Sequence, residues 1–77
     1  MREVHVVTVD DVKLPSAFTL LDISQSGARL KAPDMTGIPR EFYLMLRGDL
    51  MRWCRVAWRN KTQAGVRFIK EPKADAR

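Results

Sequence analysis

Cysteine and histidine are almost missing from this chain of 77 residues, which contains one of each, Cys54 and His5. A single cysteine cannot form an internal disulfide, and zinc needs about four nitrogen or sulfur ligands. We therefore expect no metal and no cofactor. His5 is expected to be an ordinary strand residue, and Cys54 a small buried residue rather than a nucleophile. Low cysteine usage also fits a reducing compartment, so we expect a cytoplasmic protein.

Long apolar runs are missing as well. No stretch approaches the ~20 residues that a membrane-spanning helix needs, and no basic start followed by an apolar segment suggests an export signal. A domain of this size buries only about 60% of its unfolded surface and supports few buried, strained groups. No glycine-rich phosphate loop of the usual spacing occurs either. We therefore expect one domain with a binding role and not an enzyme.

Positive charge is confined to the second part of the chain. Residues 1–46 carry five basic and six acidic side chains, whereas residues 47–77 carry nine basic and three acidic ones. The net charge of +5 therefore comes entirely from the second part. A basic segment attracts partners that bear phosphate, such as nucleotides, nucleic acid or an anionic membrane. The same charge also suits an ordinary solubility surface, and the sequence leaves both interpretations open.

Six short segments have the alternating or β-branched patterns of strands, and turn residues separate them. They are residues 3–9, 17–23, 28–31, 41–46, 50–59 and 63–69. No segment has a clear helical period, so the pattern indicates an all-β barrel or sandwich formed by residues 1–69. Closure of the sheet would hide the edges that a small β domain exposes. Residues 70–77 lack apolar anchors and are expected to be a flexible tail or the start of a short helix.

Alternation within these segments predicts which side chains face the core. The residues expected to share the inner face of residues 41–46 are Phe42, Leu44 and Leu46. In residues 63–69, Val66 and Phe68 are expected to lie opposite Arg67. The inner residues expected for residues 50–59 are Cys54, Val56 and Trp58. The outer residues expected there are Trp53, Arg55, Ala57 and Arg59.

The most informative stretch is residues 21–30, which read LDISQSGARL. The apolar residues expected to point inward are Ile23, Ala28 and Leu30. This leaves Asp22 and Ser24 on the outside at a strand end, and Gly27 allows a positive φ or a close approach of the backbone. The carboxylate of such a rim can accept hydrogen bonds from the N–H edge of a guanine. The same residue types also form an Asx or Ser turn that closes a hairpin.

Three motifs, taken in order, resemble the PilZ domain family. They are D-x-S-x-x-G at Asp22, Ser24 and Gly27 with an apolar Leu30 after it, C-R-V-A-W-R at residues 54–59, and G-V-R-F at residues 65–68. The likeness extends from about Ala17 to Ile69. It implies a six-stranded antiparallel β-barrel of the split-barrel type and a bacterial second-messenger receptor for cyclic di-GMP. It also implies that Asp22, Ser24 and Gly27 line one guanine.

The chain departs from the family pattern at its start, because no R-x-x-x-R motif precedes Asp22. Arg2 lies 20 residues before Asp22, at an offset that suits the second arginine of that motif, and the first would fall before Met1. Loss of one such charge-assisted contact weakens binding by about ten- to over a hundredfold. An earlier start, substitution by Arg29 or Lys31, or loss of the ligand would each account for the departure. The candidate ligand-binding residues are Asp22, Ser24, Gly27, Arg2 and Arg29.

The resemblance implies a single-domain cyclic di-GMP receptor or adaptor that signals by binding a partner protein. A second hypothesis is a degenerate PilZ domain that binds protein without nucleotide, with Trp53 and Tyr43 as anchors if they are exposed. Trp53 would otherwise cover the outer face of the barrel against the tail. A third hypothesis is a basic barrel that binds RNA or single-stranded DNA through its arginines and Trp53. Against this, Arg52 and Arg55 are expected on opposite strand faces, which splits the basic patch.

Overall fold

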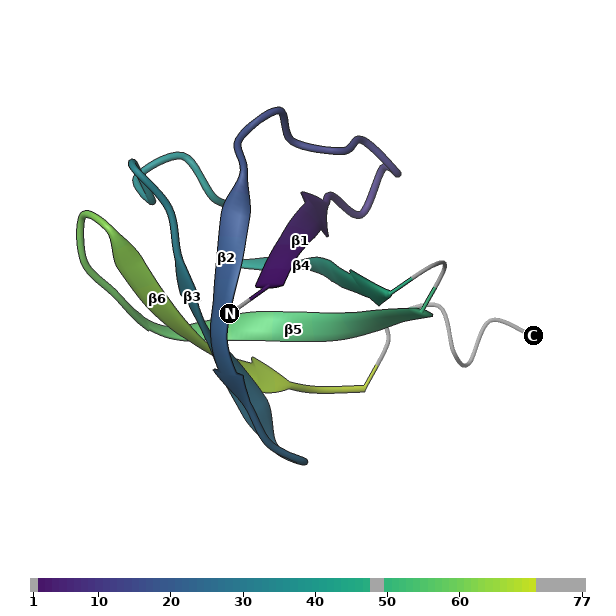
Figure 1. Cartoon of the computed structure of the whole chain (residues 1–77). Coiled ribbons are helices and arrows are strands. Elements are labelled where there is room, and N and C mark those ends of the chain that lie inside the picture. Colours follow the sequence, from purple (N-terminus) through teal and green to yellow (C-terminus); the bar gives the residue numbers. More distant parts are fainter. Residues whose placement is uncertain (1, 48–49, 71–77) are drawn as a thin grey trace.

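The computed structural model describes residues 2–47 and 50–70 of the chain. Six antiparallel strands form a closed barrel in the spatial order β1–β2–β3–β6–β5–β4 (Figure 1). The strands are β1 (Arg2–Val7), β2 (Phe18–Ile23), β3 (Gly27–Lys31), β4 (Glu41–Arg47), β5 (Leu50–Arg59) and β6 (Gln63–Phe68). The predicted six-stranded antiparallel barrel is confirmed. Of the tail expected at residues 70–77, all but Lys70 lies outside the described residues.

Two long-range pairings close the barrel. β1 pairs with β4, where Val6 lies opposite Leu44, and β3 pairs with β6, where Leu30 lies opposite Ala64. The remaining neighbours in the barrel are consecutive strands joined by hairpins or a loop. Each of the six described strands therefore has a partner on both sides, which removes the exposed edges that a small open sheet would have.

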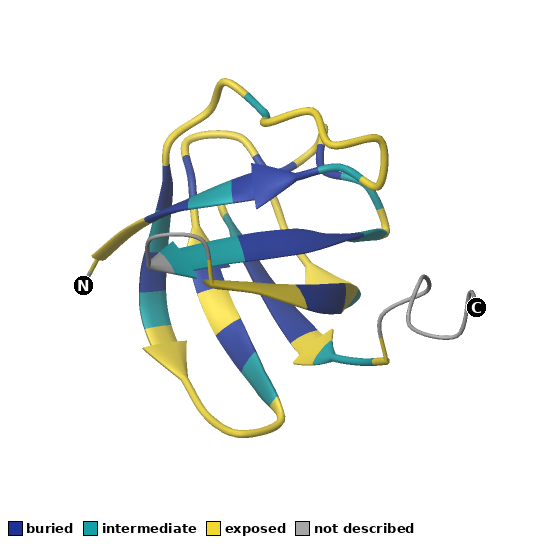
Figure 2. Ribbon diagram, turned by 90° about the vertical axis from the view of Figure 1, so that its right-hand side faces the viewer, coloured by how far each residue is buried: buried dark blue, intermediate teal, exposed yellow. Residues whose placement is uncertain are grey.

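One hydrophobic core fills the barrel, and its members alternate with exposed residues along the strands (Figure 2). The largest fully buried side chains are Phe18, Phe42, Leu30, Met35, Leu44, Val4, Val6 and Cys54. In β6, Val66 is buried and Phe68 packs against the core, while Arg67 between them is exposed, as predicted. The inner face predicted for β4 is confirmed too, because Leu46 packs against the core beside Phe42 and Leu44.

A second, smaller cluster lies on the outer face of the barrel. Tyr43 and Trp53 are only 8% and 6% exposed, and their rings meet edge to face with centroids 4.7 Å apart. Val7 completes the buried part, and Ile69 packs against it while its backbone N–H donates to the Trp53 carbonyl oxygen at 3.0 Å. Trp53 thus faces outward as predicted but is covered. The hypothesis that Trp53 and Tyr43 are exposed interface anchors is therefore wrong.

β-bulges interrupt the alternation in β2, β4 and β5, and two of them change the predicted faces of side chains. In β5, Val56 lies opposite Val66 and Trp58 opposite Gly65, so Ala57 is an extra residue without a partner. A bulge of one residue reverses the face of every side chain after it. Trp58 is consequently on the outside and 45% exposed, and the prediction that it points into the core is wrong.

The second bulge lies in β2, where Leu20 is opposite Leu30 and Asp22 is opposite Arg29. Leu21 is the extra residue, and it turns Asp22 to the outside, as predicted. Ile23 lies opposite Ala28 at the last position of β2, yet it is 43% exposed and outside the core cluster. The expected burial of Ile23 is therefore wrong, because the strand ends beyond the packed interior.

Candidate functional site

A cross-strand row of four residues runs over the outer face of four neighbouring strands. In the register, Trp58 of β5 lies opposite Gly65 of β6, Gly65 opposite Arg29 of β3, and Arg29 opposite Asp22 of β2. We call these four residues the Trp58 row. Both of its ends depend on a bulge, because the extra residue in β5 turns Trp58 outward and the extra residue in β2 turns Asp22 outward.

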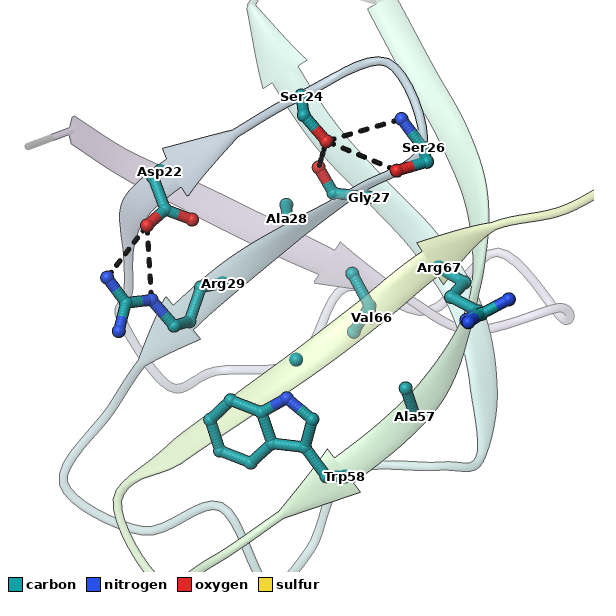
Figure 3. Close-up of a pocket in the computed structure, with 11 residues that line it drawn as sticks. Asp22, Ser24, Ser26, Gly27, Ala28, Arg29, Ala57, Trp58, Val66 and Arg67 are labelled. Atoms are coloured by element: carbon teal, nitrogen blue, oxygen red, sulfur yellow. Dashed lines mark hydrogen bonds and ion pairs between the residues drawn. The ribbon is translucent and has the colours of Figure 1, made fainter.

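Asp22 and Arg29 form an ion pair at one end of the Trp58 row (Figure 3). The Arg29 Nε and Nη2 atoms both donate to Asp22 Oδ2, at 3.1 Å and 2.7 Å. The side chain of Asp22 is 59% exposed and that of Arg29 is 49% exposed. Surface pairs of this kind contribute only about 0–1 kcal/mol to stability. The pair therefore adds little to the barrel, but it holds a carboxylate and a guanidinium in fixed positions on the surface.

Ser24 closes the hairpin between β2 and β3. Its backbone N–H donates to the Gly27 carbonyl oxygen at 2.8 Å, and its hydroxyl accepts from the Ser26 N–H at 3.3 Å. The Ser24 and Ser26 hydroxyl oxygens are themselves 3.3 Å apart. The interpretation of this motif as a serine turn is confirmed, and the turn leaves both hydroxyl groups exposed beside the Trp58 row.

Two glycines in the strands make room for the site, each for a different reason. A Cβ atom at Gly27 would collide with the backbone carbonyl oxygen of Val66 on β6, so the close approach of β3 and β6 requires glycine there. A Cβ atom at Gly65 would instead overlap the indole of Trp58. The indole therefore lies directly against the backbone of Gly65, with much of its surface open to solvent (Figure 3).

These features line one hollow of about 220 Å³ on the barrel surface. Four of the five predicted ligand residues line it, namely Asp22, Ser24, Gly27 and Arg29. The fifth does not, because Arg2 lies against a separate hollow formed with residues 20–23 of β2. The two hollows share only Asp22, so the structure brings Arg2 near one edge of the site without placing it inside.

Among the lining residues that the sequence interpretation did not assign to the site are the two with large side chains, Trp58 and Arg67. The signal that could have identified Trp58 is Gly65, since an isolated glycine inside a strand indicates a bulge or a close approach by another group. The sequence interpretation placed Trp58 in the core by extending the alternation of β5. This alternation holds up to Val56 and is broken at Ala57. The bulge at Ala57 cannot be read from the period of two itself.

Cys54 and His5 are the residues that could otherwise act as a nucleophile, a base or a metal ligand. Burial raises the pKa of the Cys54 thiol to about 12, although a backbone hydrogen bond from Leu44 and the charge of Arg52 favour the thiolate slightly. A thiol with this pKa is a core residue and a poor nucleophile. His5 lies in β1 opposite Met45. Among residues 2–47 and 50–70, no three His, Cys, Asp or Glu side chains are grouped closely enough to hold a metal ion.

Helices long and apolar enough to cross a membrane do not occur in the described part of the chain. Comparison of the whole chain with protein-family models, with curated proteins and with solved structures finds no match in any of the three.

Proposed function

We propose that this chain binds cyclic di-GMP in the hollow over the Trp58 row, as its likeness to the PilZ family implies. The observation that supports the proposal is the convergence of residues from four strands. Asp22, Ser24 and Gly27 belong to the D-x-S-x-x-G motif, and Arg29 is a candidate substitute for the missing arginine. All four share one hollow with an exposed tryptophan that the motif does not predict.

The chemistry of the hollow suits a guanine base. Guanine offers O6 and N7 as acceptors for a guanidinium such as Arg29, and its N1–H and N2 amino groups are donors for a carboxylate such as Asp22. An exposed indole adds stacking, which contributes about 1–3 kcal/mol for each base. Because Gly65 has no side chain, the indole of Trp58 lies against the strand backbone at the position next to Arg29 in the row.

The size of the hollow limits how much of the ligand it encloses. Pockets that enclose a whole small molecule usually measure about 300–1,000 Å³, whereas this hollow measures about 220 Å³ and is open on the surface. It therefore suits one base, with the ribose and phosphate groups lying over the neighbouring strands. An open site of this kind gives modest affinity, and a partner protein docked over the ligand would raise it by excluding water.

A second candidate is an adaptor that binds a partner protein at the same surface without nucleotide. It is favoured by the position of Arg2 outside the hollow, and by the exposed apolar surface of Trp58 and Ile23, which flanks the polar residues. Exposed aromatic side chains with arginine neighbours are common anchors of protein interfaces. The two candidates differ in whether nucleotide binds to the isolated chain.

Isothermal titration of the full chain with cyclic di-GMP tests the proposal. We expect saturable heat at ligand concentrations up to ~100 µM, about tenfold weaker binding by Trp58→Ala, and a similar or larger loss in Asp22→Asn. Cyclic di-AMP is the control ligand, because adenine lacks the paired N1–H and N2 donors that a carboxylate accepts. Absence of heat with cyclic di-GMP in this range would refute nucleotide binding and leave the adaptor.

A further inference from the structure

A second cross-strand row lies beside the Trp58 row on the same outer face. In the register, Glu41 of β4 is opposite Arg55 of β5, Arg55 is opposite Arg67 of β6, and Arg67 is opposite Gly27 of β3. We call these residues the Arg67 row. Two arginines thus lie directly opposite each other on neighbouring strands, an arrangement in which like charges destabilise the sheet.

Only one of these two arginines is neutralised within the described residues. Arg55 Nε donates to the Glu41 Oε2 atom at 2.8 Å, and Arg55 Nη2 forms an ion pair with the same oxygen at 2.8 Å. Arg67 has no carboxylate within ion-pair distance in the part of the chain that the structure describes. Glu41 therefore offsets the charge of Arg55, and no carboxylate of residues 2–47 or 50–70 offsets the charge of Arg67.

Arg67 also differs from the other arginine that lines the hollow. The guanidinium of Arg29 forms an ion pair with Asp22, whereas that of Arg67 lies at the opposite side of the hollow with the Trp58 indole between them in the view of Figure 3. Gly27 beside Arg67 carries no side chain, so the β3 side of its guanidinium is unobstructed by a neighbour in the row. The hollow thus presents an aromatic face, a paired carboxylate and one free cation.

The fold itself does not require a cation at position 67. Alternation requires only that Val66 and Phe68 point inward and that the residue between them tolerates solvent. A neutral polar side chain would satisfy this without opposing Arg55. A side chain that is unfavourable for stability and lines a site is typical of a functional residue.

We propose that Arg67 binds a phosphate group of the nucleotide whose base stacks on Trp58, a role that rests on the proposed function. A phosphodiester accepts two parallel hydrogen bonds from a guanidinium, which stays charged at any physiological pH. The bound phosphate would also relieve the repulsion between Arg67 and Arg55. Arg67 in β6, and not Arg2, then supplies the cation that contacts the phosphate.

The test combines binding and stability in one set of variants. Arg67→Gln is compared with Arg2→Gln and with Lys13→Gln, a variant with the same loss of charge at an exposed residue that does not line the hollow. Each variant is titrated with cyclic di-GMP at ~50 mM and ~300 mM salt, because screening weakens a phosphate contact at the higher concentration. Thermal unfolding without ligand is measured in parallel.

We expect Arg67→Gln to bind about ten- to a hundredfold more weakly than the wild type at low salt, with less dependence on salt. Its unfolding midpoint should equal or exceed that of the wild type, since the repulsion from Arg55 is removed. Lys13→Gln and Arg2→Gln should bind within about threefold of the wild type.

Two results would overturn the role of Arg67. One is wild-type affinity in Arg67→Gln together with a large loss in Arg2→Gln, which would leave the proposed nucleotide binding intact and move the phosphate contact to β1. The other is a lowered unfolding midpoint in Arg67→Gln, which would make the residue structural. Absence of binding by the wild type would instead refute the proposed function itself.

Discussion

Trp53 and Trp58 lie five residues apart on the same strand and on the same outer face, yet their surroundings differ. Trp53 is 6% exposed and packs against Tyr43, whereas Trp58 is 45% exposed and lies over Gly65. An even alternation would have put residues of odd and even number on opposite faces. The extra residue Ala57 brings both indoles to the outside.

The comparison separates two uses of a large aromatic side chain. Around Trp53 the neighbours are aromatic and aliphatic, so the indole is buried and stabilises the fold. Around Trp58 the neighbours are a glycine and charged residues, so the indole remains available to a ligand. Both positions hold a tryptophan, so the neighbours on the adjacent strands determine whether the indole is buried or exposed.

The largest expected effect is a difference in stability between two tryptophan variants. Trp53→Ala should lower the free energy of unfolding by about 3–5 kcal/mol, because it removes a buried ring and its edge-to-face partner. Trp58→Ala should lower it by about 1 kcal/mol or less, because the ring is largely exposed. Urea unfolding followed by far-ultraviolet circular dichroism measures both. Equal losses would contradict the separation of the two regions.

The two glycines of the site give a second contrast. Gly27→Ala forces a Cβ atom against the backbone carbonyl of Val66, which cannot move alone, so we expect a loss of about 1–3 kcal/mol in stability. Gly65→Ala forces only the exposed indole of Trp58 to move. The free energy of unfolding of Gly65→Ala should change by only about 0.5 kcal/mol. Its affinity for cyclic di-GMP should fall as it does in Trp58→Ala.

Thermal unfolding and titration with cyclic di-GMP check both glycine variants. Trp58 fluorescence in a Trp53→Phe background reports directly whether the indole of Gly65→Ala has moved. An unchanged emission spectrum and unchanged affinity in Gly65→Ala would show that the indole does not depend on the open backbone beneath it.

A small change in stability is also expected when the Asp22–Arg29 pair is broken. Arg29→Gln should alter the free energy of unfolding by about 0–1 kcal/mol, since both side chains are about half exposed. The same substitution should weaken cyclic di-GMP binding several-fold, because it removes the donor and frees Asp22. Denaturation and titration on one sample compare the two effects. A large loss of stability would assign the pair to the barrel and not to the site.

Much of the barrel could be predicted because its strands carry local signals. Alternating and β-branched patterns identified all six strands and the inner faces of β4 and β6. The outward position of Asp22 was predicted too, although the bulge at Leu21 is what produces it. The serine and glycine residues at 24–27 identified the hairpin. Gly27 was expected either to adopt a positive φ or to permit a close approach, and the clash with the Val66 carbonyl oxygen shows that the close approach applies.

The errors have a common physical origin. Trp58 was assigned to the core and Ile23 was expected to be buried, while the sequence left open whether Trp53 is exposed or covered. Each of these depends on what a strand meets across the barrel, or on where it ends relative to the packed interior. A period of two along one segment contains neither piece of information. The same holds for Arg67, whose opposition to Arg55 exists only in the register of β5 and β6.

The amino-acid sequence by itself determined the strands, the polar hairpin and the uneven charge, because these follow from the chemistry of neighbours along the chain. The tertiary structure alone decided which tryptophan is covered, which arginines form ion pairs among the described residues and which polar residues share a hollow. The reason is that a single extra residue in β5, and another in β2, changes which side chains meet across strands while leaving local composition almost unchanged.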